Sequence, residues 1–174
     1  MDVLVNNAGR SVAIPHNDMS AATRDIWHAL YQLNVVAPWE LITDCRLMLE
    51  AQALRGERAG CVVNISSHAG VRPEGTSIPY AASKATLNHV TRLLARTLGP
   101  AIRVNAVAPG LVDTPMTHDW LQAQQRWRDT TPMRRSAMPD DIAQIVASLV
   151  ASDYLTGEII LADGGLNLGA IDNN

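Results

Sequence analysis

Residues 1–10, MDVLVNNAGR, begin with a short apolar run, Val3-Leu4-Val5, and pass at once into Asn6-Asn7-Ala8-Gly9. A brief apolar segment that stops at Asn and Gly is typical of a buried strand ending in a loop. Buried strands are usually central to a sheet. This opening therefore predicts a chain built around a sheet with both faces covered.

Three later segments have the same character: short, rich in Val and Ile, and apolar rather than strictly alternating. Together they give four expected strands, Val3–Asn7, Cys61–Ser66, Ile102–Val107 and Glu158–Ala162. Helical patterns separate these strands at about Ala21 to Arg55, about Pro79 to Leu98, and Pro139 to Ala151. Strand and helix in alternation predict an α/β fold with a parallel sheet and right-handed crossovers. Because there is no repeat or linker, we expect one domain over residues 1–174.

Composition narrows the class of protein. The 174 residues carry a formal net charge of −3 and 47% hydrophobic residues, which is typical of a globular chain. No basic stripe stands out to neutralise phosphates, so we expect no nucleic-acid partner. The sequence shows no targeting segment or membrane-length apolar run, which predicts no membrane association and a cytoplasmic location. Cys45 and Cys61 lack CxxC spacing, so we expect core residues and neither a metal site nor a disulfide.

Tyr80 and Lys84 lie four residues apart near the start of the second long helix, which places both side chains on one helical face. A phenol with a pKa of ~10 is a poor acid or base at neutral pH. A nearby ammonium favours the phenolate and is expected to lower the pKa of Tyr80 into a usable range. The competing interpretation is an ordinary pair of neighbours on a solvated surface.

Ser66 and Ser67 stand at the carboxyl end of a predicted parallel strand, where open α/β sheets bind their ligands. Their hydroxyls could converge with Tyr80 and Lys84 on a polarised carbonyl. Alternatively the serines only cap the loop, and for Ser66 this second interpretation is preferred. His68 follows in the same loop; we expect it to face solvent and assign it no role.

Asn34 lies in the stretch Leu33–Pro38, LNVVAP, inside an otherwise long helical pattern. Pro38 has no amide hydrogen, so the carbonyl of Asn34 loses its helical partner and the helix is expected to bend. The freed carbonyl could hold a water that links Lys84 to solvent. A plain packing kink is the alternative.

The third strand ends in another tight loop, Asn105–Gly110, followed by Val112-Asp113-Thr114. Loops with candidate functional residues thus follow three strands, and we expect them to lie on the same side of the sheet. The segment Thr114–Met138 lacks strong periodicity and is expected to be a mobile insertion over the site that sets the substrate. Its four arginines form the densest basic patch, which is either a solvated helix face or a contact for an anionic substrate.

Taken together, these residues resemble the short-chain dehydrogenase/reductase family. The matches run in chain order over nearly the whole sequence: Asn6-Asn7-Ala8-Gly9, Asn34 in LNVVAPW, Ser67 in VVNISSHAG, Tyr80-Ala81-Ala82-Ser83-Lys84, Asn105–Gly110 in NAVAPG, and Thr156-Gly157 with Asp163-Gly164-Gly165. The family's catalytic tetrad falls by this resemblance on Asn34, Ser67, Tyr80 and Lys84. The implied reaction is hydride transfer between NAD or NADP and a carbonyl or alcohol substrate, with Tyr80 as the acid and base.

The resemblance also implies where the cofactor lies. Tyr80 and Lys84 would contact it, with Lys84 holding the nicotinamide ribose. The other expected cofactor-binding residues are Asn6, Ala8 and Gly9 on the adenosine side, and Pro109, Gly110, Val112 and Thr114 around the nicotinamide. Subunit interfaces in the family usually form from the two long helices, so a homo-oligomer, a dimer or tetramer, is expected.

The resemblance covers the family's catalytic, C-terminal portion. Family members begin with a strand, a Gly-rich turn of the TGxxxGxG type and two further strand–helix units, which have no counterpart in these residues. The expected fold is therefore an incomplete, Rossmann-like, doubly wound sheet of about four strands, starting at the family's fourth. The residue that selects NAD or NADP lies in this N-terminal portion of family members, which has no counterpart here.

The alternative function is a cofactor-free remnant that acts only as an oligomerising or binding module. A sugar epimerase or dehydratase of the extended relatives fits less well, because of the Asn-Asn-Ala-Gly motif.

Overall fold

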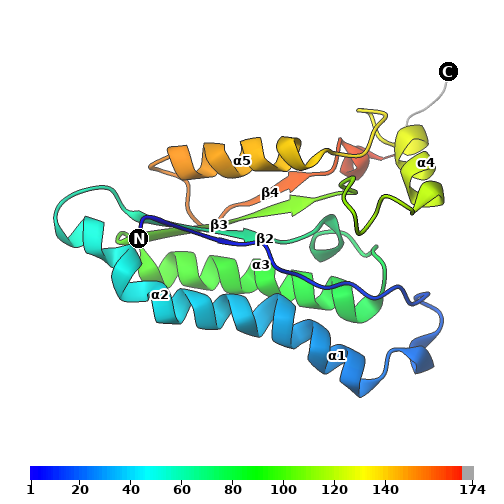
Figure 1. The fold of residues 1–174 in the computed structure, drawn as a ribbon, viewed down its shortest axis with the longest axis horizontal. Coiled ribbons are helices and arrows are strands. Elements are labelled where there is room, and N and C mark those ends of the chain that lie inside the picture. Colours follow the sequence, from blue (N-terminus) through cyan, green and yellow to red (C-terminus); the bar gives the residue numbers. More distant parts are fainter. Residues whose placement is uncertain (170–174) are drawn as a thin grey trace.

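The computed structural model describes residues 1–169 and contains a four-stranded parallel sheet. The strands follow one another across the sheet in chain order (Figure 1): β1 (Val3–Asn6), β2 (Gly60–Ile65), β3 (Ile102–Pro109) and β4 (Ile159–Ala162). The predicted parallel α/β sheet of about four strands is confirmed. Among the described residues β1 pairs only with β2, so its apolar run lies at an edge of the sheet with Val5 exposed, as expected if the strand corresponds to the family's fourth.

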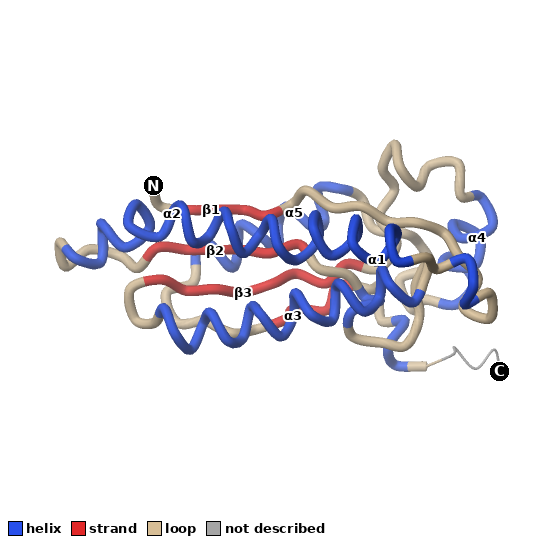
Figure 2. Tube along the Cα trace, turned by 90° about the horizontal axis from the view of Figure 1, so that it is seen from below, coloured by secondary structure: helices blue, strands red, loops and turns tan. Residues whose placement is uncertain are grey.

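The helices cover both faces of this sheet. On one face lie α1 (Arg24–Tyr31), α2 (Ala37–Leu54) and α3 (Ile78–Leu98), and on the other lies α5 (Pro139–Ala151), as Figures 1 and 2 show. The sheet is thus wound on both sides in the Rossmann-like manner. The expected single domain includes residues 170–174, which lie outside the described part of the chain.

Two apolar cores fill the spaces between the layers, because successive side chains of a strand point to opposite faces. Val62 and Val104 face α2 and α3, where they pack with Ile42, Leu49, Leu94 and Leu98. Cys61, Val63 and Val107 face α5 and contact Leu149. Cys61 is therefore a core residue as expected, and Cys45 packs half-buried against the first core.

The chain crosses from one face to the other between β3 and β4. The connections from β1 to β2 and from β2 to β3 run over the α1–α3 face and are right-handed (Figure 2). β4 continues in the same direction across the sheet, but its connection passes through α5 on the opposite face. This third crossover is left-handed, so the expectation of right-handed crossovers throughout is wrong there. The long connection over residues 110–138 allows the change of face.

That connection is more regular than the sequence pattern indicated. It contains a helix, α4 (Leu121–Thr130), which packs over the ends of the strands at one end of the molecule (Figure 1). Only a few of its side chains, such as Trp127, contact the rest of the protein, and Gln124 is its one buried residue. The apolar periodicity that usually marks a helix is therefore absent, although the helix forms.

None of the helices in residues 1–169 combines the length and apolar character needed to span a bilayer.

Candidate active site

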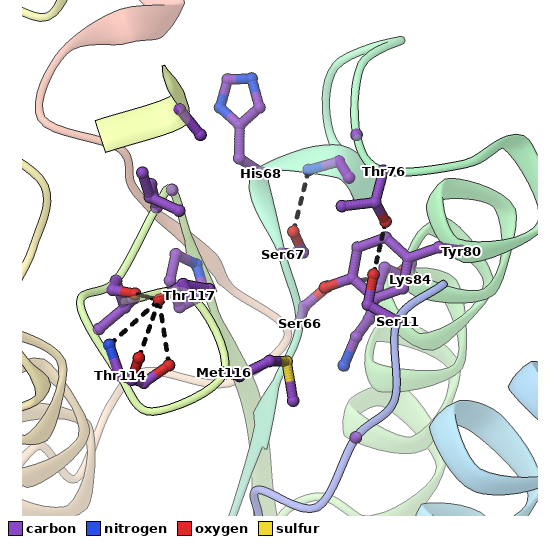
Figure 3. A pocket seen from close by; sticks show the side chains of 18 of the residues that line it. Ser11, Ser66, Ser67, His68, Thr76, Tyr80, Lys84, Thr114, Met116 and Thr117 are labelled. Atoms are coloured by element: carbon purple, nitrogen blue, oxygen red, sulfur yellow. Dashed lines mark hydrogen bonds between the residues drawn. The ribbon is translucent and has the colours of Figure 1, made fainter. Parts of the chain in front are cut away.

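A cavity of about 420 Å³ opens at the carboxyl ends of the strands (Figure 3). The loops that follow β1, β2 and β3 all contribute to it, and α3 and α4 complete its walls. The prediction that three strand ends meet at one site is therefore confirmed, and it follows from the parallel direction of the strands.

Most of the expected site residues line this cavity: Gly9, Ser67, Tyr80, Lys84, Pro109, Gly110, Val112 and Thr114. Three expected residues do not: Asn6, Ala8 and Asn34. Asn7 lines the cavity in place of its neighbours. The cavity also includes residues that the sequence did not single out, such as Ser11 and Thr76, whose hydroxyl oxygens lie 2.5 Å apart.

Lys84 is a buried cation in the wall of the cavity. Its side chain projects from α3, and Nζ donates a hydrogen bond to the carbonyl oxygen of Ile65 at 2.9 Å. Burial lowers the pKa of Lys84 to about 8, since a charged amine loses solvation. The ammonium therefore stays mostly protonated at neutral pH and can give up its proton in mild alkali.

Tyr80 stands one helical turn before Lys84 and is half-buried. Burial raises the pKa of its phenol, and hydrogen bonding with Ser67 acts in the opposite direction. The expectation that Lys84 lowers the pKa of Tyr80 is not met in this structure, because desolvation of the phenolate dominates. Ser67, rather than Lys84, is the group that favours the ionised phenol.

The two serines after β2 have separate roles. Ser66 is buried, and its hydroxyl donates to the backbone carbonyl of Lys84 at 3.3 Å, which ties β2 to α3. Ser67 is only half-buried and lines the cavity, while its oxygen accepts from the amide of Ala69 at 3.2 Å. Ser66 is thus a structural residue, but it bonds to α3 and does not cap the loop; Ser67 is the residue that caps it, and Ser67 also lines the cavity.

Asn34 lies behind the cavity wall at the predicted break in the helix. Residues Gln32–Val36 form a π-helical turn, in which the amide of Ala37 donates to the carbonyl of Gln32, so the expected irregularity before Pro38 is confirmed. The buried side chain of Asn34 donates to the Arg10 carbonyl at 3.0 Å and accepts from the Arg10 amide at 2.9 Å. Asn34 therefore fixes the loop after β1.

This loop passes very close to the buried groups. A Cβ atom on Gly9 would lie 3.3 Å from Lys84 Nζ and 3.5 Å from Asn34 Oδ1. Only a residue without a side chain fits comfortably between the two. The loop after β1 is thus held directly against Lys84.

Asn6 supports the sheet instead of facing the cavity. Its side-chain amide donates to Asn64 Oδ1 at 2.8 Å, and the amide of Asn64 donates to Thr91 Oγ1 at 2.9 Å. These buried bonds connect β1, β2 and α3. The side chain of Asn6 is therefore a structural contact below the site.

His68 departs from the expectation that it faces solvent. It is buried, and its Nδ1 lies 3.1 Å from Oδ2 of Asp163, which follows β4. The indole of Trp127 packs edge-on against its ring, with the centroids 6.2 Å apart. No local spacing could show this, because the two partners are 95 positions apart in the chain.

The wall opposite Tyr80 comes from the connection after β3. The indole of Trp127 lies against the backbone of Gly110, where a Cβ atom would approach it to 2.5 Å. Met116 and Trp120 add apolar surface. At the rim, Arg126 of the basic patch lies 3.6 Å from Glu74, so its charge is already paired in the structure.

Comparison with known proteins identifies the family of the chain. The family model described as enoyl-(acyl carrier protein) reductase matches residues 1–167. A protein assigned as a ketoacyl reductase of the granaticin polyketide synthase of Streptomyces violaceoruber is 48% identical over 97% of this chain and 67% of its own length. The chain belongs to the short-chain dehydrogenase/reductase family.

Solved structures of short-chain dehydrogenase/reductases have the same fold. A protein of Burkholderia xenovorans assigned to the family superposes with a TM-score of 0.89, at 36% identity, over 97% of this chain and 66% of that one. A 3-ketoacyl-(acyl-carrier-protein) reductase of Brucella melitensis, solved with NADH, gives a TM-score of 0.86 at 27% identity, over 95% and 67%. This short-chain dehydrogenase/reductase chain thus spans about two thirds of the length of the relatives it matches.

Within residues 1–169 of this family member, no group of three or more His, Cys, Asp or Glu side chains is arranged to hold a metal ion.

Proposed function

We propose that this chain carries the catalytic side of an NAD- or NADP-dependent oxidoreductase that interconverts a carbonyl and an alcohol. The observation that supports this most is the meeting of Ser67, Tyr80 and Lys84 in one cavity at the strand ends. When a carbonyl is reduced, negative charge develops on its oxygen. A phenol, a hydroxyl and an ammonium can supply the proton, the hydrogen bond and the positive charge that stabilise this oxygen.

Each residue has a distinct part in this proposal. When bound, the nicotinamide supplies or accepts the hydride. The phenol of Tyr80 gives its proton to the substrate oxygen in the reducing direction and takes it back in the other. Ser67 donates a hydrogen bond to the same oxygen. Lys84, protonated at neutral pH, would hold the nicotinamide ribose.

The residues around the cavity fit the nicotinamide end of such a cofactor. The cavity is lined there by Gly9, Pro109, Gly110, Val112 and Thr114. Lys84 offers the ammonium that would hold the ribose. Solved relatives contain NADH in some cases and NADP in others, and nothing in these residues selects between the two.

For the substrate we propose a ketoacyl compound. The wall formed by Leu111, Met116, Trp120 and Trp127 is apolar, which suits an acyl chain better than a sugar. Ketoacyl reduction is also what the names of the Streptomyces and Brucella relatives describe.

The test is NADH and NADPH oxidation with acetoacetyl-coenzyme A, by the protein expressed from its complete reading frame. Tyr80→Phe should lower kcat by about 100-fold or more, because the proton donor is lost. Cofactor affinity, measured by calorimetry, should stay within about twofold, as expected for a change that leaves ground-state binding intact.

Tyr31→Phe is the matched control. The Tyr31 hydroxyl lies 3.1 Å from that of Thr86, outside the cavity, so its loss should leave turnover unchanged. Full turnover in Tyr80→Phe would remove Tyr80 from the reaction. Absence of both cofactor binding and carbonyl turnover in the unmodified protein would favour the alternative of a cofactor-free oligomerising or binding module.

A further inference from the structure

The carboxylate of Asp163 is fixed by four hydrogen bonds. It accepts from the amides of Gly165 and Asn167 at 3.0 and 2.9 Å, and from the Asn167 side chain at 3.1 Å. The fourth bond, at 3.1 Å, joins it to His68 Nδ1. Burial acts to raise the pKa of Asp163, but the hydrogen bonds outweigh it and the pKa lies below its ordinary value. An ionised carboxylate only accepts, so His68 Nδ1 carries the proton and donates it.

His68 directly follows Ser67 in a tight turn, His68–Gly70, that Ser67 caps. Within it, the Gly70 amide donates to the Ser67 carbonyl at 2.9 Å, and the Val71 amide donates to the His68 carbonyl at 2.9 Å. Figure 3 shows the imidazole pointing away from Tyr80 and Lys84. Both Ser67 and His68 line the cavity, and His68 also bonds to Asp163 in the loop after β4.

The other end of the turn rests on α3. A Cβ atom on Gly70 would lie 2.7 Å from the backbone of Lys84, and the Gly70 carbonyl accepts from the Asn88 side chain at 3.0 Å. The turn is thus attached to α3 at Gly70 and to the loop after β4 at His68. Ser67 stands beside the second attachment, so its position depends on the bond to Asp163.

We propose that His68 is a positioning residue, which holds the Ser67 hydroxyl against Tyr80 through its Nδ1–H bond to Asp163. This inference rests on the proposed function, in which Ser67 and Tyr80 act on the same substrate oxygen. The other ring nitrogen, Nε2, is buried without a hydrogen-bond partner in the described part of the chain. Nδ1 is thus the ring nitrogen that makes a hydrogen bond in the described part of the chain.

This asymmetry supplies a matched pair of variants. His68→Asn keeps an N–H at the level of Nδ1 and can preserve the bond to Asp163, whereas His68→Gln places its amide at the level of Nε2 and cannot. His118→Asn is the control, since His118 makes a bond of equal length, 3.1 Å, to Asp113 but is exposed.

The first readout is the pKa of the Tyr80 phenol in residues 1–174, followed by NMR of ring-labelled tyrosine. Tyr80 is one of three tyrosines, so its signal is assigned by its loss in Tyr80→Phe. Ser67→Ala should raise this pKa, and His68→Gln should raise it by a similar amount, about half a unit or more for a lost hydrogen bond. His68→Asn and His118→Asn should leave it unchanged.

A double substitution tests whether His68 acts through Ser67. In the Ser67→Ala background, His68→Gln should add no further shift. An unchanged phenol pKa in His68→Gln, or an equal shift with Ser67 absent, would overturn the proposal and leave His68 as a packing residue. Should His68→Gln fail to fold, Asp163→Asn removes the charged acceptor of the same bond and is read in the same way.

The second readout is turnover by the protein from its complete reading frame. His68→Gln should lower kcat by about tenfold without changing the KM for cofactor, and His68→Asn should restore it. Absence of turnover in the unmodified protein would count against the proposed function alone, because the phenol titration decides the positioning role without it. A loss of kcat that is equal in His68→Asn and His68→Gln would contradict the positioning role.

Discussion

Lys84 shows how much the surroundings of a residue decide what it can do. The Tyr80–Lys84 spacing alone indicates a shared helical face, and both side chains do reach one cavity. Burial, which spacing does not show, changes the chemistry of both groups. It lowers the pKa of Lys84 to about 8 and raises the pKa of Tyr80.

The pKa of Lys84 predicts an unusual dependence of stability on pH. The unfolded chain, with a lysine pKa of 10.5, keeps a proton above pH 8 that the folded protein has released. The free energy of unfolding should therefore rise between pH 8 and pH 10, by about 2 kcal/mol relative to the Lys84→Met variant. Urea unfolding at several pH values measures the difference. Parallel curves for the two proteins would show that the ammonium is not desolvated.

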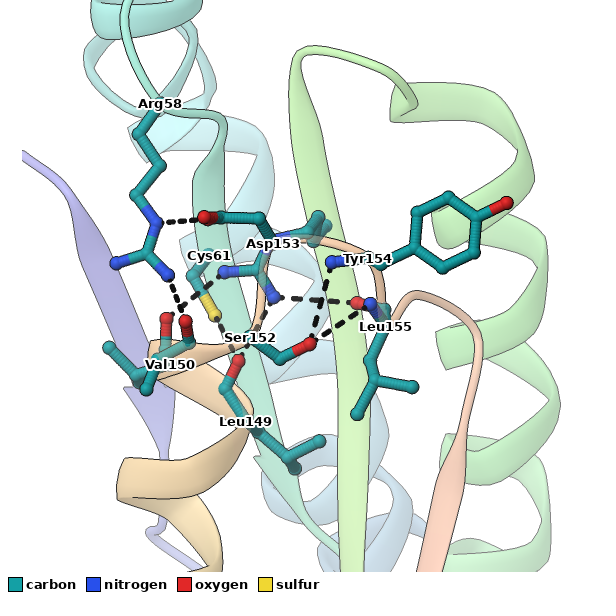
Figure 4. A network of polar contacts seen from close by, with 10 residues as sticks. Arg58, Cys61, Leu149, Val150, Ser152, Asp153, Tyr154 and Leu155 are labelled. Atoms are coloured by element: carbon teal, nitrogen blue, oxygen red, sulfur yellow. Dashed lines mark hydrogen bonds and ion pairs between the residues drawn. The ribbon is translucent and has the colours of Figure 1, made fainter.

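At the scale of the elements, the end of α5 depends on arginines that belong to other parts of the chain. Arg103, buried in β3, donates to the carbonyls of Leu149 and Val150 at 3.0 and 3.2 Å. Arg58 bonds to Asp153 and to the carbonyl of Ala151 (Figure 4). The last carbonyls of a helix have no partner within it and carry partial negative charge, so the two guanidiniums satisfy and compensate them.

The two arginines should contribute unequally to stability. Arg103→Met leaves buried carbonyls without donors, and we expect it to lower the free energy of unfolding by about 3 kcal/mol. Arg58→Met removes an exposed pair and should cost less than about 1 kcal/mol. Urea unfolding of both variants gives the comparison, and similar losses would mean that burial of Arg103 is not what matters.

Sequence patterns located the elements well, because strand and helix ends carry local signals. Pro79 and Gly99 mark the two ends of α3, and Pro38 marks the π-helical turn. What the patterns missed depends on distant contacts. His68 bonds to Asp163, and Arg103 bonds to the end of α5. The residues next to His68 and Arg103 in the sequence give no sign of either contact.

At the scale of the whole molecule, α2 carries large apolar side chains on its outer surface. Leu47 is 78% exposed and Leu54 80%, and half of each of Trp39 and Met48 is exposed. We propose, in line with the family resemblance, that a second copy of the chain covers this surface. Exposed apolar patches on soluble proteins commonly mark such contacts.

Sedimentation velocity tests this assembly. The protein should sediment as a dimer or larger, and Leu47→Glu should convert it to monomer, because a carboxylate cannot be buried there without a partner. Leu121→Glu is the matched control, since Leu121 is equally apolar and 73% exposed but lies on α4. A monomer at all concentrations, or equal effects of both substitutions, would contradict the assignment of α2.

The left-handed return to β4 has a consequence for how the site can be altered. The residues of the cavity that follow β3, from Gly110 to Trp127, belong to one uninterrupted piece of chain. The groups that handle the proton lie elsewhere, after β2 and on α3. If the proposed function is correct, the residues that contact the substrate chain and the residues that transfer the proton therefore lie on separate segments of the chain. Residues 110–127 could then be replaced by the corresponding segment of a relative without any change to the residues after β2 and on α3.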